Sequence, residues 1–232
     1  APTNITEIER KAIIQAAEQS GGGKVYLEYE PKVAAIGAGL DIFKPSGNMV
    51  IDMGGGTSDI AVLSLGDIVA SESVRLAGDQ LNSDIAEYIK EHHGLIIGEH
   101  TAERIKIELG TAQKVDDPQT MEVRGRDVAS GMPKQIETNE NEIADALHDT
   151  LEQIVRASVA VLETVPPELA SDIIDRGIML TGGTAMLHGI DKLFSDRLKV
   201  PVVVSQDPLD NVAKGAGELL ERMQSDGGKN RK

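Results

Sequence analysis

One stretch, residues 49–62, constrains the fold more than any other. An apolar run ends in Asp52, three glycines and two hydroxyl residues follow, and a second apolar run begins after Asp59. This order predicts two strands joined by a glycine turn. Glycine admits positive φ and lets a ligand approach bare amides, and a turn of exposed N–H groups binds anions, usually phosphate. An ordinary hairpin is the alternative, but it does not need three consecutive glycines, whose backbone entropy is costly. We therefore favour a phosphate site, with Asp52 beside a phosphate-bound magnesium ion.

Composition narrows the classes of function. The 232 residues suffice for one large domain or two modest ones, and a hydrophobic content of 40% supports a folded core. A formal charge of −15 disfavours nucleic acid as the main partner, and 2% aromatic residues without Trp leave no stacking surface for single strands. The absence of Cys excludes a thiolate metal site and fits a reducing compartment.

Two further observations concern the ends of the chain and membranes. No apolar run approaches the ~20 residues of a membrane-spanning helix. The first residues contain neither an initiator Met nor a signal-peptide pattern. We therefore expect the natural protein to begin upstream of Ala1.

Ahead of the glycine turn, the pattern predicts a helix, a strand and a second helix. Thr6 and Glu9 form a capping box for a helix that runs to about residue 20. Its apolar stripe is expected to be buried and consists of Ile8, Ala12, Ile13, Ala16 and Ala17. Residues 25–27 resemble a short buried strand and residues 32–39 a helix. A third strand, 68–75, returns after the second apolar run, so this part predicts an α/β fold.

The rest of the chain divides into a small inserted subdomain and a second α/β portion. Residues 79–138 predict two helices, beginning at 79 and 101, and two exposed antiparallel strands, 121–123 and 133–138. Asn139 and Glu142 cap the longest helix, which extends to about 164. Then follow a buried strand (177–180), a second glycine turn (181–184), a helix (186–199), a strand (202–204) and a final helix (211–223). The tail 227–232 is expected to be disordered.

Several features admit both a functional and a structural interpretation. The second glycine turn could bring a ligand close to a helix N-terminus, or could simply connect a strand to a helix. Glu103 and Lys106 share a helix face, and this spacing alone favours a surface ion pair. Glu28 and Glu30 precede Pro31, where either could be a solvated acid or could order a water molecule near a phosphate.

The sequence disfavours a histidine metal site and the common phosphate-binding motifs. His92 and His93 are adjacent, so their side chains diverge on a helix, and no i, i+4 pair of ligands accompanies them. A solvated helix end explains them better than a metal site. Neither a Walker-A pattern nor a complete Gly-x-Gly-x-x-Gly pattern occurs. Phosphate chemistry must therefore use another architecture.

Five segments together resemble the MreB/Mbl family of bacterial actin homologues, in the same order along residues 1–223. They are Glu30-Pro31-x-x-Ala34-Ala35-Ile36-Gly37-Ala38-Gly39-Leu40, Asp52-x-Gly54-Gly55-Gly56-Thr57, Gly98-x-x-Thr101-Ala102-Glu103-Arg104-Ile105-Lys106, Pro166-Pro167-Glu168-Leu169-x-Ser171-Asp172-Ile173 and Thr181-Gly182-Gly183. The second segment alone marks the wider superfamily of actin, heat-shock ATPases and sugar kinases. The segments at 101–106 and 166–169 are more specific to MreB and its paralogues.

The resemblance implies an actin-like α/β fold with a nucleotide cleft between two domains. Residues 1–43 would be the C-terminal part of an incomplete first domain, and residues 44–78 and 139–214 a complete second domain. Residues 79–138 would be a small inserted α+β subdomain, and 215–232 a final helix packing back on the first domain plus a disordered basic tail. The family's earlier phosphate loop, of the Asp-x-Gly-Thr type, and its hydrophobic membrane-insertion element do not occur in the 232 residues. We therefore expect this stretch alone to bind ATP weakly and to hydrolyse little.

The resemblance also implies the site residues. The second phosphate loop would consist of Gly54, Gly55, Gly56 and Thr57. The adenosine would face Gly182, Gly183, Thr184 and Ala185. Thr184 stands where the family usually has a third glycine, and threonine is less favourable than glycine at positive φ. We therefore expect the contact at this position to differ in detail.

The remaining implied roles belong to charged and hydroxyl residues. Asp52 would support Mg²⁺, mainly through water, because this ion keeps much of its hydration shell. Glu30 would position the attacking water, assisted by Thr57. Glu103 and Lys106 would hold the ribose and base side of the nucleotide.

The implied function is that of a filament-forming ATPase that binds ATP and Mg²⁺. It would control cell shape by organising cell-wall synthesis, at a cytoplasmic location on the inner face of the cell membrane. Its partners would be further copies of itself, morphogenesis proteins and the inner membrane, and not nucleic acid.

Three alternatives stay open. A sugar kinase of the same superfamily needs an acceptor base and a sugar pocket, for which we find no constellation. A chaperone-type ATPase needs a substrate-binding domain, and only a short basic tail follows Met223. A structural protein without catalysis is disfavoured by the presence of Glu30, Asp52 and Thr57.

Overall fold

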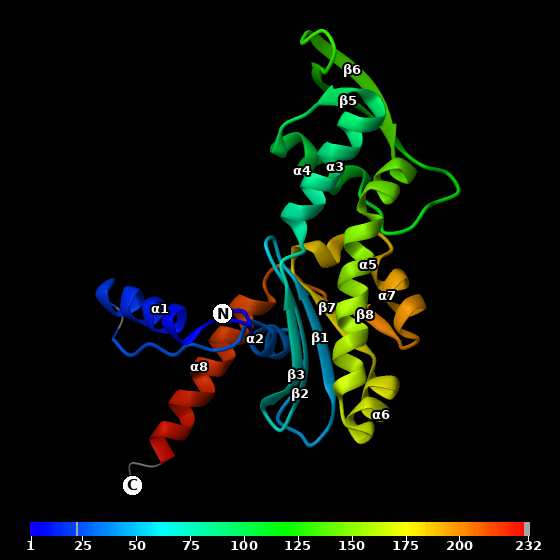
Figure 1. The fold of residues 1–232 in the computed structure, drawn as a ribbon. Helices are drawn as coiled ribbons and strands as arrows, with labels where there is room; N and C mark the ends of the chain where they lie inside the picture. Colours follow the sequence, from blue (N-terminus) through cyan, green and yellow to red (C-terminus); the bar gives the residue numbers. More distant parts are fainter. Residues whose placement is uncertain (22, 230–232) are drawn as a thin grey trace.

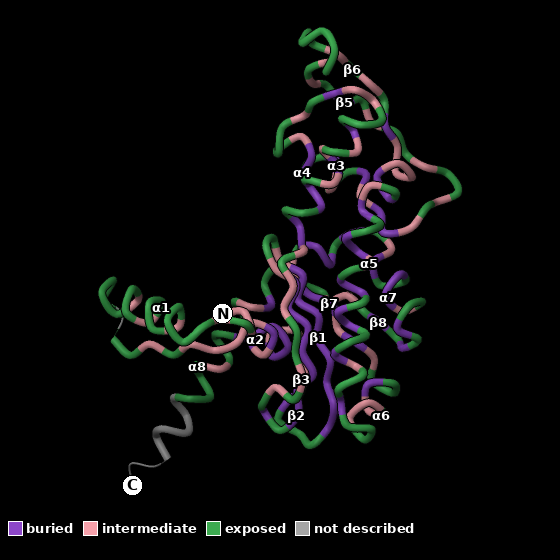
Figure 2. The backbone as a smooth tube through the Cα atoms, viewed as in Figure 1, coloured by how far each residue is buried: buried purple, intermediate pink, exposed green. Residues whose placement is uncertain are grey.

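A five-stranded sheet with strand order β3-β2-β1-β7-β8 forms the centre of the computed structural model, which describes residues 1–21 and 23–229. The strands are β1 (Asn48–Met53), β2 (Ser58–Ser64), β3 (Asp67–Val74), β7 (Ile178–Thr181) and β8 (Val202–Val204). The first three form an antiparallel meander, whereas β7 is parallel to β1 and β8 is parallel to β7. β1 and β2 are buried along their whole length, because helices cover both faces of the sheet (Figures 1 and 2).

The two faces of the sheet contribute to two separate hydrophobic cores, because successive strand residues point to opposite sides. Ile51 and its neighbours Met49 and Met53 belong to the larger core, which they share with α5 (Glu140–Thr164), α6 (Pro167–Arg176) and α7 (Ile190–Leu198). Val50 belongs to the smaller core, together with residues of α2 (Glu30–Gly37). The sheet is therefore the middle layer of an α/β/α arrangement, in agreement with the predicted α/β class.

Helix α2 also packs against α8 (Asn211–Lys229), and the two helices cross with their backbones in contact. A Cβ atom added at Gly37 would lie 1.8 Å from the carbonyl oxygen of Asn211, and one added at Gly215 would lie 1.9 Å from that of Val33. No side chain fits at such distances, so this close crossing requires glycine on both helices.

A second, smaller unit projects from one end of the sheet (Figure 1). It contains α3 (Gly78–His93), α4 (Glu99–Leu109) and a three-stranded antiparallel sheet of β4 (Leu95–Ile96), β5 (Thr120–Asp127) and β6 (Pro133–Asn139). Gly94 ends α3 in the left-handed conformation, with φ of 62°. Helix α5 begins at the end of β6 and runs back along the central sheet, so it contacts both units.

Two predictions for the first 30 residues are wrong. Helix α1 (Glu7–Gln19) has the expected capping box between Thr6 and Glu9, but none of its residues is buried, and Ile8 is 82% exposed. Residues 25–27 form no strand in the described part of the chain. Capping is a local interaction, whereas burial and strand pairing need a neighbouring surface, and neither segment has one among the described residues.

Two other boundaries differ from the prediction. The expected helix 186–199 is a short 3₁₀ helix, η1 (Gly183–Met186), followed by α7, because Gly189 adopts a positive φ of 71° between them. The expected disordered tail is wrong for Gly227–Lys229, which continue α8, and its last residues, 230–232, lie outside the described residues. None of the described helices is both long and apolar enough to cross a membrane.

Candidate functional site

The two glycine turns lie side by side at the carboxyl ends of β1 and β7. These strands are parallel neighbours, and Asp52 pairs in register with Thr181. Gly182 has φ of 84°, and a Cβ atom there would lie 2.3 Å from the carbonyl oxygen of Met53 and 2.7 Å from Oδ1 of Asp52. The second turn thus needs glycine because it packs directly against the end of β1. The carboxyl edge of parallel strands is where open α/β sheets bind ligands.

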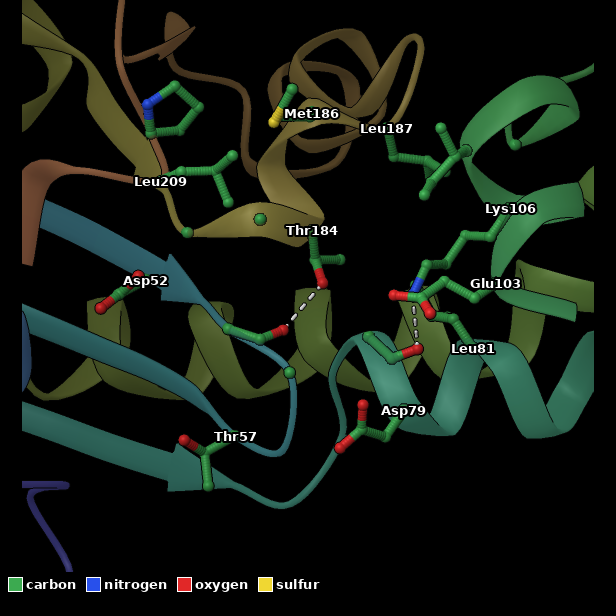
Figure 3. Close-up of a pocket in the computed structure, with 18 of the residues that line it drawn as sticks. Asp52, Thr57, Asp79, Leu81, Glu103, Lys106, Thr184, Met186, Leu187 and Leu209 are labelled. Atoms are coloured by element: carbon green, nitrogen blue, oxygen red, sulfur yellow. Dashed lines mark hydrogen bonds between the residues drawn. The ribbon is translucent and has the colours of Figure 1, made fainter. Parts of the chain in front are cut away.

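A cavity of about 760 Å³ opens at this edge, between the two turns, α3 and α4 (Figure 3). Most residues of the expected site line it: Glu30, Asp52, Gly54, Gly55, Thr57, Glu103, Lys106, Gly182, Gly183 and Thr184. Gly56 is exposed at the tip of its turn, and Ala185 is buried behind the second turn, so neither lines the cavity. The structure thus brings together expected site residues from four separate sequence segments.

The backbone of the first turn is arranged so that its N–H groups are available to a ligand. The Gly54 carbonyl accepts a hydrogen bond of 3.1 Å from the Gly78 N–H, and the Gly55 carbonyl accepts one of 2.8 Å from the Asp79 N–H. Both carbonyls are therefore occupied by the first residues of α3. Within the described chain, the N–H groups of Gly55 and Gly56 have no acceptor. Free backbone amides in a turn are the expected features of an anion site.

Asp52 is a buried carboxylate with an unusual proton affinity. It is only 5% exposed, and burial, together with the nearby charges of Glu30 and Asp59, raises its pKa to about 7. Asp59 is buried as well, but it accepts hydrogen bonds from Thr57 Oγ1 at 3.0 Å and from the Thr3 N–H at 3.2 Å. These bonds compensate the charge of Asp59, whereas no described residue donates a hydrogen bond to Asp52.

A cation near Asp52 would relieve this unfavourable burial. The described residues contain no group of three or more His, Asp or Glu side chains arranged to hold a metal ion. This does not conflict with Mg²⁺, which keeps several waters and usually takes one or two carboxylates plus substrate phosphates. The uncompensated carboxylate of Asp52 therefore fits the expected magnesium role, with water and phosphate as the other ligands.

Lys106 and Glu103 do not form the ion pair that their spacing alone favours. Lys106 Nζ instead donates a hydrogen bond of 2.8 Å to the carbonyl oxygen of Gly78 (Figure 3). Burial lowers the pKa of Lys106, while the charges of Glu103 and Asp79 partly oppose this shift. Glu28, the other acid considered before Pro31, pairs with Lys32 at 2.8 Å, and Glu30 rather than Glu28 lines the cavity.

Thr184 does not have the positive φ that we associated with its position. The only non-glycine residues with positive φ in the described chain are Leu65 and Lys199. Thr184 lies in η1, and its hydroxyl donates a hydrogen bond of 2.9 Å to the carbonyl oxygen of Gly54. Threonine in place of the expected glycine therefore adds a side-chain hydrogen bond to the Gly54 carbonyl and does not strain the backbone.

Sequence patterns missed the apolar wall of the cavity. Met186, Leu187 and Leu209 face it in Figure 3, and Met186 and Leu209 are 61% and 68% exposed. Met186 and Leu187 stand at the start of the predicted helix 186–199, and Leu209 lies in a turn after β8, so the sequence pattern did not place any of them at a cavity. Asp79 was missed too, although its position directly after Gly78 at a helix start could have indicated it.

Comparisons with known proteins identify the family of the chain. The family model described as "MreB/Mbl protein" matches residues 1–227. The chain is 54% identical over 222 residues to the cell shape-determining protein Mbl of Bacillus subtilis (strain 168), covering 96% of the chain and 67% of Mbl. It is 47% identical over 227 residues to the cell shape-determining protein MreB of Escherichia coli (strain K12), covering 98% of the chain and 65% of MreB. The chain thus spans about two thirds of the length of these relatives.

Solved structures of MreB proteins also match the fold of the chain. The crystal structure of MreB5 of Spiroplasma citri bound to AMPPNP superimposes with a TM-score of 0.95 at 38% identity, over 99% of this chain and 69% of that chain. The corresponding structure bound to ADP also has a TM-score of 0.95. The MamK double helical filament matches with a TM-score of 0.78 at 18% identity, over 95% and 67% of the two chains, which supports the fold alone.

Proposed function

Because the chain belongs to the MreB/Mbl family of actin-like, cell shape-determining proteins, we propose that it binds ATP with Mg²⁺ and polymerises into filaments. Hydrolysis of ATP is coupled to polymerisation. The filaments organise cell-wall synthesis at the inner face of the cell membrane, together with morphogenesis proteins. The structure of MreB5 bound to AMPPNP supports the nucleotide.

The observation that carries this proposal is the arrangement of the cavity. Two glycine turns meet there, two amides of the first turn are free, and a buried carboxylate lies beside them. The free amide of Gly55 binds phosphate oxygens in the cavity, and that of Gly56 is available to a phosphate at the exposed tip of the turn. The second turn and its apolar neighbours Met186 and Leu209 enclose the adenosine, while Glu103 and Lys106 contact the ribose side.

Hydrolysis needs a water molecule aimed at the terminal phosphate. Glu30, at the first residue of α2, accepts a proton of this water, and Thr57 holds the water in line. When bound, Mg²⁺ would neutralise phosphate charge, and Asp52 would be the residue of this chain that supports it. Domain closure around the nucleotide then biases assembly, as in other phosphate-sensing switches.

The proposal also divides the chain into parts with different roles. Residues 1–43 belong to a first actin-like domain, and residues 44–78 and 139–214 form the second. The small unit of residues 79–138 supplies the α4 side of the cleft, and residues from 215 onward pack back on α2. The crossing of α2 and α8 then lies between the two domains and beside the nucleotide.

Phosphate release from ATP by the intact protein tests the catalytic assignments. We expect Glu30→Ala and Asp52→Ala each to reduce the rate, and Glu28→Ala, which removes a neighbouring acid paired with Lys32, to leave it unchanged. Wild-type turnover in both site variants would refute the assignments. Sedimentation with ATP should recover wild-type protein in the pellet, and a protein that stays monomeric would favour another ATPase or kinase of the superfamily.

The 232 residues by themselves provide a separate test. We expect them to bind ATP weakly and to hydrolyse little, because the family's earlier phosphate loop, of the Asp-x-Gly-Thr type, does not occur in them. Isothermal titration calorimetry measures this directly. Tight stoichiometric binding would show that the first turn and its neighbours suffice for the nucleotide.

A further inference from the structure

The hydroxyl of Thr184 connects the two glycine turns. The residue is 6% exposed, and its Oγ1 donates a hydrogen bond of 2.9 Å to the Gly54 carbonyl, which belongs to the other turn (Figure 3). The two residues are 130 positions apart in the sequence. A glycine at position 184, which the family resemblance led us to expect, has no hydroxyl and could not form this bond.

The bond bears on the orientation of one peptide group. In a trans peptide the carbonyl oxygen and the following N–H point in opposite directions, and the described chain contains no cis peptide. The Gly54 carbonyl is held by two donors, the Thr184 hydroxyl and the Gly78 N–H. The N–H of Gly55, which belongs to the same peptide group, is therefore directed away from these donors and has no acceptor in the described chain.

This peptide group needs external support. It joins two glycines, which restrict backbone rotation less than any other residues, so neither residue has a side chain that would oppose a flip of the carbonyl toward the ligand. The surroundings are tight, because a Cβ atom at Gly78 would lie 3.2 Å from Lys106 Nζ and 3.3 Å from both Thr184 Oγ1 and the Gly54 carbonyl oxygen. Two elements, η1 through Thr184 and α3 through Gly78, therefore hold this one carbonyl, and Lys106 packs beside it on Gly78.

We propose that Thr184 is a positioning residue for phosphate: from the adenosine turn, its hydroxyl holds the Gly54–Gly55 peptide so that the Gly55 N–H faces the phosphates. This inference rests on the proposed binding of a nucleotide in the cavity. It assigns a role in phosphate recognition to a residue that the family resemblance places only against the adenosine.

Thr184→Val tests the inference in the intact protein, because valine replaces the hydroxyl by a methyl group of similar size. Dissociation constants for AMPPNP, ADP and adenosine are measured for wild type, Thr184→Val and Thr184→Ser, with adenosine followed by competition against a fluorescent nucleotide. We expect Thr184→Val to weaken AMPPNP and ADP by about two- to tenfold, the range for one lost hydrogen bond. Adenosine, which has no phosphate, should bind as before, and Thr184→Ser should retain wild-type affinities.

Thr150→Val is the matched control, since it removes another buried hydroxyl. Thr150 donates its hydrogen bond to Asp84 of α3, and neither residue lines the cavity. It should leave all three affinities unchanged. An equal loss for adenosine and ADP in Thr184→Val would overturn the inference, because the hydroxyl would then act only on the adenosine turn. Unchanged affinities would overturn it too. A wild-type protein that binds neither ADP nor AMPPNP would instead refute the proposed function, and this inference with it.

Discussion

Asp59 lies directly opposite Asp52 in the ladder between β1 and β2, so two carboxylates share one buried corner of the cleft. Their surroundings are unequal. Asp59 accepts hydrogen bonds from Thr57 and Thr3, whereas Asp52 has a pKa raised to about 7. The pair therefore consists of one hydrogen-bonded carboxylate, Asp59, and one, Asp52, that can hold a proton near neutral pH.

The raised pKa of Asp52 predicts a pH-dependent stability in the absence of nucleotide. Between about pH 4 and pH 7 the unfolded chain releases this proton while the folded chain retains it, so the folded state loses stability as pH rises through this range. We expect Asp52→Asn to increase the free energy of unfolding at pH 8, by up to about 4 kcal/mol, and to change it little at pH 4. Urea unfolding of both proteins at the two pH values measures this, and an equal difference at both would contradict it.

The hydrogen bond from Thr57 to Asp59 predicts coupled effects on hydrolysis. Because Thr57 Oγ1 donates its proton to Asp59, it can only accept a hydrogen bond from the attacking water. We expect Thr57→Val and Asp59→Asn each to slow ATP hydrolysis by about tenfold or more. The double variant should be no slower than Thr57→Val, because Asp59 acts through Thr57. Single-turnover rates test this, and independent, multiplicative losses would argue against the coupling.

Lys106 is the single lysine or arginine among the described residues that line the cavity, whereas several carboxylates surround it. Removing its charge should weaken the binding of an anionic nucleotide. We expect Lys106→Met to raise the dissociation constant of ADP by about ten- to a hundredfold, as for the loss of a hydrogen bond to a charged group. Arg104→Met, an exposed change on the same helix, is the control. Comparable losses for both variants would indicate a general effect of charge and not a contact.

The crossing of α2 and α8 predicts that two glycine-to-alanine substitutions in α8 change the free energy of unfolding in opposite directions. Gly215→Ala places a Cβ atom 1.9 Å from the Val33 carbonyl oxygen, so the helices must separate. We expect the free energy of unfolding to fall by about 2 kcal/mol or more. Gly217→Ala, at an exposed position with open space, should raise it by up to about 1 kcal/mol. Thermal unfolding of both variants measures this, and equal effects would show that helix propensity dominates at both positions.

The sequence predicted most of the central fold because its signals are local and strong. The turn of residues 54–56 with its flanking apolar runs defines β1 and β2, and Asn139 caps α5 through hydrogen bonds to the N–H groups of Asn141 and Glu142. Helix α1 shows the limit of such signals. Its capping box predicts that the helix forms, but the apolar spacing of Ile8 does not reveal whether another surface covers it.

The site was predictable where backbone geometry imposes the residue type, and much less so elsewhere. Both glycine turns could be predicted from consecutive glycines that follow an apolar run. The hydrogen bonds from Thr184 to Gly54 and from Lys106 to Gly78 did not, because they join residues 130 and 28 positions apart. For Glu103 and Lys106, spacing alone favoured an ion pair, and only the proximity of α3 in the fold explains why Lys106 bonds there instead.

The length of α5 has a mechanical consequence. Its 25 residues extend over about 37 Å, and buried side chains from Ile143 to Val161 attach it to the small unit at one end and to the central sheet at the other. Because α5 contributes buried side chains to both units, loss of the whole helix exposes core in both. The small unit should therefore melt cooperatively with the sheet, and amide hydrogen exchange along α5 should report one opening event shared by both.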